Sequence, residues 1–266
     1  SGLIKNSQEL TAQYMRVLLL GAFKHGKSVL AVTASEFCPD TLPAKEMTEL
    51  SDILIHQFDP GGINSLRDLN LSAPVIDMSM LSEEPELRST MRQTLALTKE
   101  RVMDGVTKTV IVDTVSSFDK TFHVALRARF EKWGLYSAIL EEHRKYFGAL
   151  QALPCDKIFI GHTKGVSYVE EKDADKIIAA EARKAAVELP GGATVVLDVS
   201  GQSGSWYLGA MDMILPVYAT TVGNNTTYAI YPHGIRGFAH GTRFRNLKQK
   251  EEPNLRLLFK KIREGK

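Results

Sequence analysis

Residues 21–28 read Gly21-Ala22-Phe23-Lys24-His25-Gly26-Lys27-Ser28, which is the pattern G-x-x-x-x-G-K-S. Two glycines at this spacing let the backbone turn tightly and direct its N–H groups at a phosphate. Lys27 is then placed to reach the β- and γ-phosphates of a nucleoside triphosphate, and the Ser28 hydroxyl is placed to bind Mg²⁺. The stretch predicts a phosphate-binding loop, or P-loop, that binds a nucleoside triphosphate together with Mg²⁺.

The residues on either side of this loop have the order that a P-loop requires. Residues 15–20 are a short apolar run that ends at Gly21, and residues 29–37 are rich in Ala, Val and Leu and are long enough for a helix. A strand, a glycine loop and a helix in this order place the helix N-terminus against a bound anion. The alternative, a glycine turn without a ligand, does not explain this order. The residues predicted to contact the nucleotide are Gly21, Phe23, Lys24, His25, Gly26, Lys27, Ser28 and Val29.

Short β-branched runs alternate with longer helical patterns up to Gly161. Strands are predicted at residues 52–56, 73–77, 109–113 and 157–161. Helical patterns cover residues 83–104 and 119–153, the second broken near Gly134 and Gly148. Two later strands, near residues 213–218 and 226–231, flank Gly223-Asn224-Asn225 and predict a hairpin. The expected fold is α/β, with a mostly parallel central sheet, helices on both faces and a C-terminal β-hairpin extension.

The 266 residues are predicted to form one domain, because no repeat or long linker divides them. Three segments differ from the rest. Residues 1–14 read as an N-terminal extension in which Ser1-Gly2 resembles a tag-cleavage scar. Residues 164–205 are expected to form a mobile polar region, with a helix-like stretch at 172–188 and a flexible composition at 201–205. Residues 248–266 form a basic amphipathic tail.

Composition limits the possible classes of protein. The net charge of +2 permits a nucleic-acid partner but does not argue for one. The two cysteines, Cys38 and Cys155, are far apart and lack a C-x-x-C spacing, which argues against a structural zinc site and a disulfide framework. No apolar run approaches the roughly 18–20 residues that span a bilayer. We expect a cytoplasmic protein without a membrane partner.

Asp113 ends the β-branched run Thr109-Val110-Ile111-Val112 and is the predicted carboxylate of the metal site. An aspartate at the carboxyl end of a buried strand beside a P-loop can hold Mg²⁺ together with Ser28. The alternative is a helix N-cap, because aspartate also caps helices. With a P-loop upstream, the metal role is favoured.

The string Val110-Ile111-Val112-Asp113-Thr114-Val115-Ser116-Ser117-Phe118 resembles the h-h-h-D-S/T-h-x-x-h signature of RecA-like ATPases. In that family the next strand ends in a Gln or His that senses the γ-phosphate, and His162 occupies this place. The family also carries a catalytic carboxylate, usually Glu, after the strand that follows the P-loop helix. The matching residue is Asp59, in Asp59-Pro60-Gly61-Gly62, which could orient the attacking water. A structural hydrogen bond for His162 and a simple turn for Asp59 are the alternatives.

Late in the chain, Gly241-Thr242-Arg243-Phe244-Arg245 resembles the K-x-K/R finger pair that RecA-like subunits insert into a neighbour's ATP site. The planar guanidinium of arginine forms bidentate hydrogen bonds with phosphate oxygens and spreads the negative charge that develops during phosphoryl transfer. The resemblance therefore implies catalytic roles for Arg243 and Arg245 in a homo-oligomer. A solvated or nucleic-acid-facing basic pair is the alternative.

Over the whole chain, from the P-loop to Pro253-Asn254-Leu255, the arrangement is most similar to the small phage RecA-like ATPases of the Sak type. These are single-strand-annealing and recombination proteins of the AAA group. The resemblance implies ATP-dependent binding of single-stranded DNA, with a single-strand-binding or recombination protein as a further partner. The DNA-facing loops would be residues 116–121 and 164–205, and the tail adds Lys260, Lys261, Arg263 and Lys266. Residues 164–205 carry charges of both signs, so the DNA prediction rests mostly on the resemblance.

Two other functions remain open. A P-loop kinase of a small molecule or nucleotide would need an arginine-rich lid, and the sequence shows no obvious one. A weakly hydrolysing nucleotide switch that binds proteins, KaiC-like in logic, fits the departure from Glu at Asp59. A filament-forming recombinase and a hexameric helicase share the same predicted core.

Overall fold

The computed structural model of the chain describes residues 14–22, 26–165, 186–188, 194–200, 202–222, 225–232, 242, 244, 246–248 and 250–265. A nine-stranded sheet runs through the molecule with the main order β11-β10-β1-β7-β6-β3-β5, and β9 pairs with β7 and β8. Its strands are β1 (Arg16–Gly21), β3 (Ile53–Gln57), β5 (Val75–Asp77), β6 (Thr109–Asp113), β7 (Asp156–Gly165), β8 (Ala186–Glu188), β9 (Thr194–Leu197), β10 (Met213–Val222) and β11 (Asn225–Ile230). A small second sheet pairs β2 (Thr48–Glu49) with β4 (Leu71–Ser72).

The core of the large sheet is parallel. β1 pairs in parallel with β10 on one side and β7 on the other, and the parallel pairing continues through β6 and β3 to β5. β10 and β11 form an antiparallel hairpin, as the sequence predicts. β7 lies between β1 and β6, so the strand that carries Asp113 is one strand removed from the P-loop strand.

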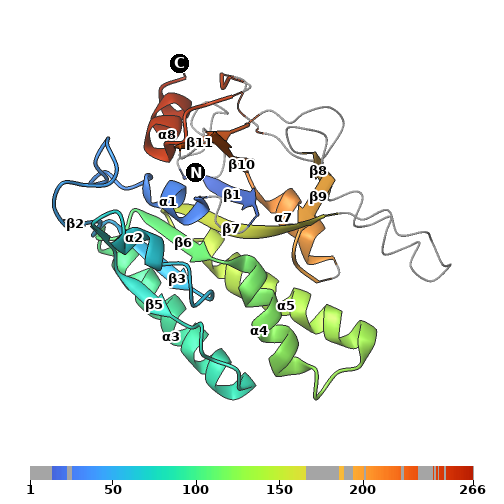
Figure 1. Cartoon of the computed structure of the whole chain (residues 1–266). Helices are drawn as coiled ribbons and strands as arrows, with labels where there is room; N and C mark the ends of the chain where they lie inside the picture. The colour runs from blue at the N-terminus through green and yellow to red at the C-terminus, as the bar shows by residue number, and fades with distance from the viewer. Residues whose placement is uncertain are drawn as a thin grey trace, which may run out of the picture.

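Helices cover both faces of the sheet (Figure 1). They are α1 (Lys27–Val32), α2 (Asn64–Arg67), α3 (Glu84–Met103), α4 (Val115–Leu126), α5 (Lys132–Gln151), α7 (Ser203–Ala210) and α8 (Leu255–Glu264). Neighbouring residues of β1 point to opposite faces, and Leu18 and Leu20 join the core under α3, α4, α5 and α7. Val17 and Leu19 join the core under α1, α2 and α8. The predicted architecture is confirmed: a mostly parallel α/β sheet with helices on both faces and a C-terminal hairpin.

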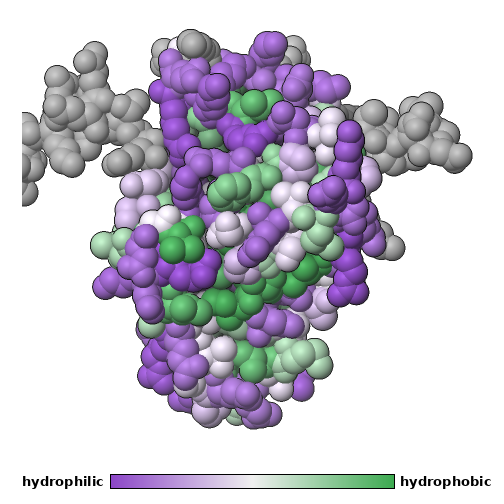
Figure 2. Space-filling view, turned by 90° about the vertical axis from the view of Figure 1, so that its left-hand side faces the viewer, coloured by the Kyte–Doolittle hydropathy of each residue, from purple (hydrophilic) through white to green (hydrophobic). Residues whose placement is uncertain are grey.

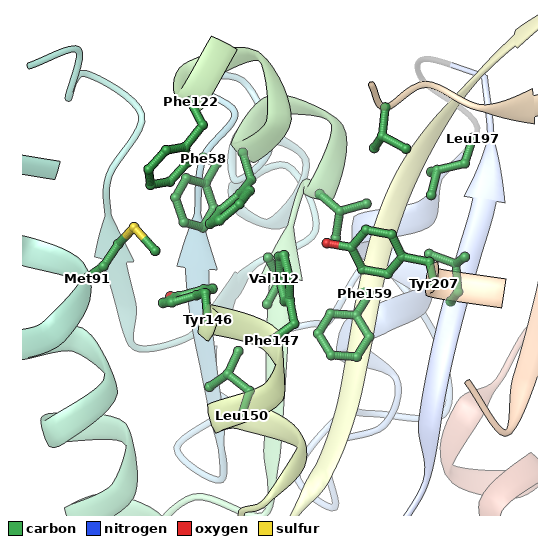
Figure 3. Packing of buried hydrophobic residues seen from close by; sticks show 14 of the residues in the cluster. Phe58, Met91, Val112, Phe122, Tyr146, Phe147, Leu150, Phe159, Leu197 and Tyr207 are labelled. Carbon is green, nitrogen blue, oxygen red and sulfur yellow. The ribbon is translucent and has the colours of Figure 1, made fainter. Parts of the chain in front are cut away.

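The core on the α3–α5 side is rich in aromatic side chains. Figure 3 shows Tyr146 and Phe147 near Val112 of β6, with Phe159 of β7 next to them, and Phe122 beside Phe58. The Phe118 ring, also in this core, lies 5.1 Å from Phe58 and 5.5 Å from Tyr146, between ring centroids. Buried aromatic pairs at such distances add stability beyond the area that they bury. This packing fixes α4 and the end of β3, which carry the residues next to the site.

Several predicted segments have a different structure. The helical pattern at 119–153 forms two helices; α4 begins earlier, at Val115, because the Thr114 side chain caps it by accepting a hydrogen bond from Ser117 N. The chain breaks between Leu126 and Lys132, and α5 continues through Gly134 and Gly148. Buried neighbours of Gly148, such as Phe147 and Leu150, hold the helix against the weak helical propensity of glycine.

The prediction of a loop at 116–121 is wrong, because these residues lie in α4 and Ser116, Phe118 and Asp119 are buried. Residues 186–188, predicted as the end of a helix, form β8, which pairs with β9. Residues 203–205, predicted as flexible, begin α7 with Ser203 and Gly204 buried. The helix predicted at residues 29–37 is shorter in the structure, because α1 ends at Val32.

The tail packs on the sheet through α8. Leu255, Leu258, Phe259 and Ile262 are buried in the core beside α1. The described cations of the predicted basic strip have acidic neighbours: Lys260 contacts Glu264, Lys261 contacts Glu251 and Arg263 contacts Asp156. The predicted basic strip is thus an amphipathic helix whose described positive charges are paired, and Lys266 lies outside the described residues.

The surface on the side of α2 and α3 is mostly hydrophilic, with a band of hydrophobic side chains across its middle (Figure 2). In the described part of the chain, no helix is both long and apolar enough to cross a membrane.

The buried His56 predicts acid sensitivity of the fold. Its Nδ1 lies 2.9 Å from the Tyr146 hydroxyl and its Nε2 lies 2.9 Å from Thr98 Oγ1. Burial lowers the pKa of His56 to about 3. Between this value and the ordinary pKa of about 6.5, the unfolded chain binds one more proton than the folded chain, so stability falls as the pH falls.

Within this window, His56 should lower the free energy of unfolding by up to about 1.4 kcal/mol for each unit that the pH falls. Urea unfolding of the wild type and of His56→Gln at pH 6.5, 5.5 and 4.5 measures this contribution. The variant should be less stable at pH 6.5 and show a shallower pH dependence. An identical pH dependence of the two proteins would contradict the assignment.

Candidate nucleotide-binding site

The predicted site residues gather at the carboxyl edge of the parallel sheet. β1 ends at Gly21, and α1 begins at Lys27 immediately after Gly26, whose φ of 71° is in the left-handed region. A φ of this sign is readily adopted only by glycine, which explains the residue at this turn. Ser28 and Val29 follow in α1 and are half-buried. Phe23, Lys24 and His25 lie outside the described residues.

Lys27 points back into the turn of its own loop. Its Nζ donates hydrogen bonds to the carbonyl oxygens of Gly21 and Ala22 at 2.9 and 2.7 Å. The side chain is buried, and burial lowers the pKa of Lys27 to about 8, although Asp113 and Asp59 act to raise it. A buried ammonium group is stabilised by an anionic partner, and a phosphate would supply one.

Ser28 and Asp113 form the second part of the site. The Ser28 hydroxyl donates a hydrogen bond of 2.7 Å to Asp113 Oδ2. Asp113 is buried, and burial raises its pKa to about 6 against the opposing effect of the Ser28 hydrogen bond. The alternative role for Asp113 as a helix cap does not apply, because Thr114 caps α4.

This pair of oxygen donors fits Mg²⁺. The ion prefers hard oxygen ligands, and it usually takes one or two from the protein and the rest from water and substrate phosphates. A hydroxyl and a carboxylate already in contact are therefore a suitable partial ligand set. Among the described residues, no cluster of three or more His, Cys, Asp or Glu could form a metal site made of protein alone.

Asp59 and His162 form the third part. The distance from His162 Nε2 to Asp59 Oδ2 is 3.3 Å, and that from His162 Nδ1 to Lys27 Nζ is 3.5 Å. Because the ammonium can only donate, Nδ1 accepts from Lys27, which leaves Nε2 to carry a proton toward Asp59. Burial and the charge of Lys27 lower the pKa of His162, whereas Asp59 raises it.

Backbone contacts hold this loop beside Asp113. The amides of Phe58 and Asp59 donate to the carbonyl oxygen of Asp113 at 2.6 and 3.1 Å. The amide of Gly61 donates to Asp59 Oδ1, so the Asp59 side chain also stabilises the turn at residues 59–62. This turn was the alternative interpretation of Asp59. The two roles use different oxygens, since Oδ2 faces His162. His162 is positioned in turn by its own amide, which donates to Ser116 Oγ at 3.0 Å.

The structure therefore brings together Lys27, Ser28, Asp59, Asp113 and His162. Arg243 and Arg245 lie outside the described residues, so their predicted roles stay predictions. Two residues with positioning roles were missed from the sequence. Ser116 was assigned to a polar loop, and Gly62 was noted only as part of a turn. The two consecutive glycines after Asp-Pro were a signal that Gly62 has a structural role. The sequence did not show that Gly62 lies against Asp113.

Gly62 lies against the carboxylate of Asp113, which makes it intolerant of a side chain. A Cβ atom on Gly62 would lie 2.6 Å from Asp113 Oδ2, whereas a Cβ on Gly61 would meet nothing closer than Asp59 Oδ1 at 3.6 Å. We expect Gly62→Ala to displace the carboxylate and lower metal-dependent nucleotide hydrolysis about tenfold or more, because a shift of about 1 Å in a site can cost 10²-fold.

Gly61→Ala is the matched control, one residue away in the same turn. It should keep activity within about threefold of the wild type, since its Cβ contact is an ordinary one. Steady-state phosphate release by the two variants makes the comparison. Equal activities would show that the Gly62 contact does not position Asp113.

Matches to known proteins come from the solved structures. No protein-family model matches the chain, and no curated protein matches it. Among solved structures, it is similar to a KaiC-like protein from the hyperthermophilic archaeon Pyrococcus horikoshii, with 10% identity and a TM-score of 0.41 over 86% of this chain and 82% of the other. The chain's own geometry is therefore the basis for its assignment. At the carboxyl edge of a mostly parallel α/β sheet, the described residues bring together a buried lysine, a serine–aspartate pair and an aspartate–histidine pair.

Proposed function

We propose that the protein is a Mg²⁺-dependent ATPase. The observation that supports this most is the convergence of Lys27, Ser28, Asp59, Asp113 and His162 at one edge of the sheet. A buried cation for phosphate, an oxygen pair for Mg²⁺ and a carboxylate for water are the groups that phosphoryl transfer requires. Their sequence positions span the whole central part of the chain, so a turn without a ligand does not account for them.

Each side chain has a distinct part in the proposed mechanism. Lys27 binds the phosphates and offsets their negative charge. Ser28 and Asp113 hold Mg²⁺, which when bound supplies further charge neutralisation of the phosphates. Asp59 orients the attacking water, and His162 holds the Asp59 carboxylate in place through Nε2. His162 thereby connects Asp59 with Lys27, the residue that contacts the phosphate.

We assign single-stranded DNA as the polymer on which this ATPase acts, in phage recombination, annealing, repair or replication. The sequence resemblance to Sak-type proteins is the main support. One structural feature adds to it: β7 continues beyond His162 and pairs with β9 through Thr163–Leu197 and Lys164–Val196. The segment expected to face DNA therefore follows directly from the strand that carries His162. Arg243 and Arg245 are assigned to a neighbouring subunit's site in a homo-oligomer.

A nucleotide switch with slow hydrolysis is the second candidate. The observation in its favour is that the short side chain of Asp59 is engaged by His162 and by the amide of Gly61. A carboxylate held in this way could position water poorly. The switch would bind MgATP as tightly as an ATPase does and turn it over slowly.

ATP hydrolysis with and without single-stranded DNA tests the proposal, with DNA binding measured across salt concentrations. We expect DNA to stimulate hydrolysis. The logarithm of the DNA-binding constant should fall linearly with the logarithm of the salt concentration. Hydrolysis without stimulation and without salt-dependent DNA binding would refute the DNA assignment alone. Phosphate transfer to a small molecule would favour a kinase. Activity per chain that does not change with protein concentration would contradict the role in a neighbouring subunit for Arg243 and Arg245.

A further inference from the structure

Tyr228 of β11 lies directly on the P-loop. A Cβ atom built on Gly26 would stand 2.7 Å from Tyr228 Cε1, 3.1 Å from Cδ1 and 3.2 Å from Cζ. The ring therefore contacts the glycine that precedes Lys27. At the same time, 42% of Tyr228 is exposed. A large aromatic ring that touches a phosphate loop and still faces solvent offers an apolar surface beside the proposed nucleotide site.

The register of the hairpin explains why the ring is there. The last residue pair of β1 and β10 is Leu20 with Pro216, and β10 then extends to Val222 beyond the edge of β1. Tyr228 pairs with Ala219 in this extension, and Ile230 pairs with Val217. Ile230 and Val217 are buried in the core beside α1, so Tyr228, two residues from Ile230, lies on the same face above the P-loop. The small side chain of Ala219 opposite leaves room for the ring.

The positions of the other site residues give the direction of a bound triphosphate. Asp113 ends β6, His162 lies within β7 and Asp59 comes shortly after β3, and these three strands all lie on one side of β1. These residues and the Ser28–Asp113 pair mark the end of the site where the terminal phosphate and metal belong. The sugar and base of the nucleotide must then leave the P-loop toward the other side of β1, where β10 and β11 lie.

We propose that Tyr228 is the stacking surface for the nucleobase of the bound triphosphate. This inference rests on the proposed function, because it concerns the same nucleotide site. Aromatic stacking tolerates every base, since each has a π-face. Tyr228 therefore strengthens binding of purine triphosphates generally and does not by itself select ATP over GTP.

The test compares a ligand with a base and a ligand without one. Calorimetric titrations with MgATP, MgGTP and Mg-tripolyphosphate are made on the wild type, Tyr228→Ala and Tyr228→Phe. We expect Tyr228→Ala to weaken both nucleotides by about tenfold and to leave tripolyphosphate within about twofold of the wild type. Tyr228→Phe keeps the ring and should bind all three as the wild type does. Tyr218→Ala is the matched control, because Tyr218 pairs with Ala229 in the same hairpin and belongs to the opposite face. It should leave all three affinities unchanged.

Each other result has a separate meaning. An equal loss of all three ligands in Tyr228→Ala would show that the ring only supports the P-loop, and tighter nucleotide binding would show that it covers the site. Either result overturns the stacking role and leaves the proposed function in place. A wild type that binds neither nucleotides nor tripolyphosphate would overturn the proposed function and this inference with it.

Discussion

Lys27→Ala is expected to weaken MgATP binding about a hundredfold or more and to abolish measurable hydrolysis. The side chain is buried at the turn of the loop, and its Nζ is held by the carbonyls of Gly21 and Ala22, 3.5 Å from His162 Nδ1. Hydrogen bonds to charged groups contribute about 1.5–3 kcal/mol each, and two such contacts with phosphate account for the expected loss. Alanine cannot replace the charge or the donors.

Lys108→Ala is the control for this variant. Lys108 immediately precedes β6, at the opposite edge of the sheet, where it contacts Glu36 and is half exposed. An exposed ion pair of this kind contributes little, so binding and hydrolysis should match those of the wild type. Calorimetric titration and phosphate release on the folded variants decide the comparison. Wild-type affinity in Lys27→Ala would contradict the placement of phosphate at this loop.

Asp113→Asn is expected to lower hydrolysis about 10²–10³-fold, the usual effect of removing one preorganised charge from a reaction site. Asparagine has nearly the same shape and can still accept the hydrogen bond from Ser28. The variant lacks only the negative charge that attracts Mg²⁺. It should therefore need a higher Mg²⁺ concentration for half-maximal activity, which a metal titration of phosphate release measures.

The same variant is expected to be more stable than the wild type in the absence of Mg²⁺. Burial raises the pKa of Asp113 to about 6, so the folded chain binds more protons than the unfolded chain between its ordinary value of 3.8 and 6. Stability is lost as the pH rises through this window, and at pH 7 the ionised carboxylate costs about 1–3 kcal/mol. Urea unfolding at pH 7 should show this gain in Asp113→Asn. A less stable variant with unchanged metal dependence would contradict both parts of the prediction.

The strands and the P-loop could be predicted from the sequence because their signals are local. The run of β-branched residues before Asp113 gave the bounds of β6 as Thr109–Asp113. The spacing of Gly21, Gly26, Lys27 and Ser28 placed the loop between β1 and α1. In each case the residues that determine the element are neighbours in the chain, and burial of a continuous apolar run leaves few alternatives.

The errors occur where polar residues have distant partners. Ser116 and Asp119 were assigned to a DNA-facing segment, yet the amide of His162 donates to Ser116 Oγ. Asp119 contacts His143 Nε2 at 2.9 Å and the amide of Ser200 at 3.0 Å. Hydrogen bonds to such partners allow polar side chains to be buried, and nothing in the local sequence reveals these partners.

The candidate site also contains residues with local sequence signals and residues whose partners are distant in the chain. Lys27 and Ser28 followed from spacing alone, whereas Asp59 and His162 are 103 positions apart and were linked only through a family resemblance. The contacts of Gly62 with Asp113 and of Tyr228 with Gly26 depend on how strands lie side by side. Strand order decides which side chains meet at the sheet edge, and it becomes known only with the structure.

Phosphate release from ATP by the wild-type chain, with Mg²⁺ and with an excess of chelator, tests the central claim most directly. The account predicts steady release with Mg²⁺ at a rate proportional to enzyme, and none above background with the chelator or in Lys27→Ala. A wild-type chain that shows neither MgATP binding nor phosphate release, with and without single-stranded DNA, would contradict it.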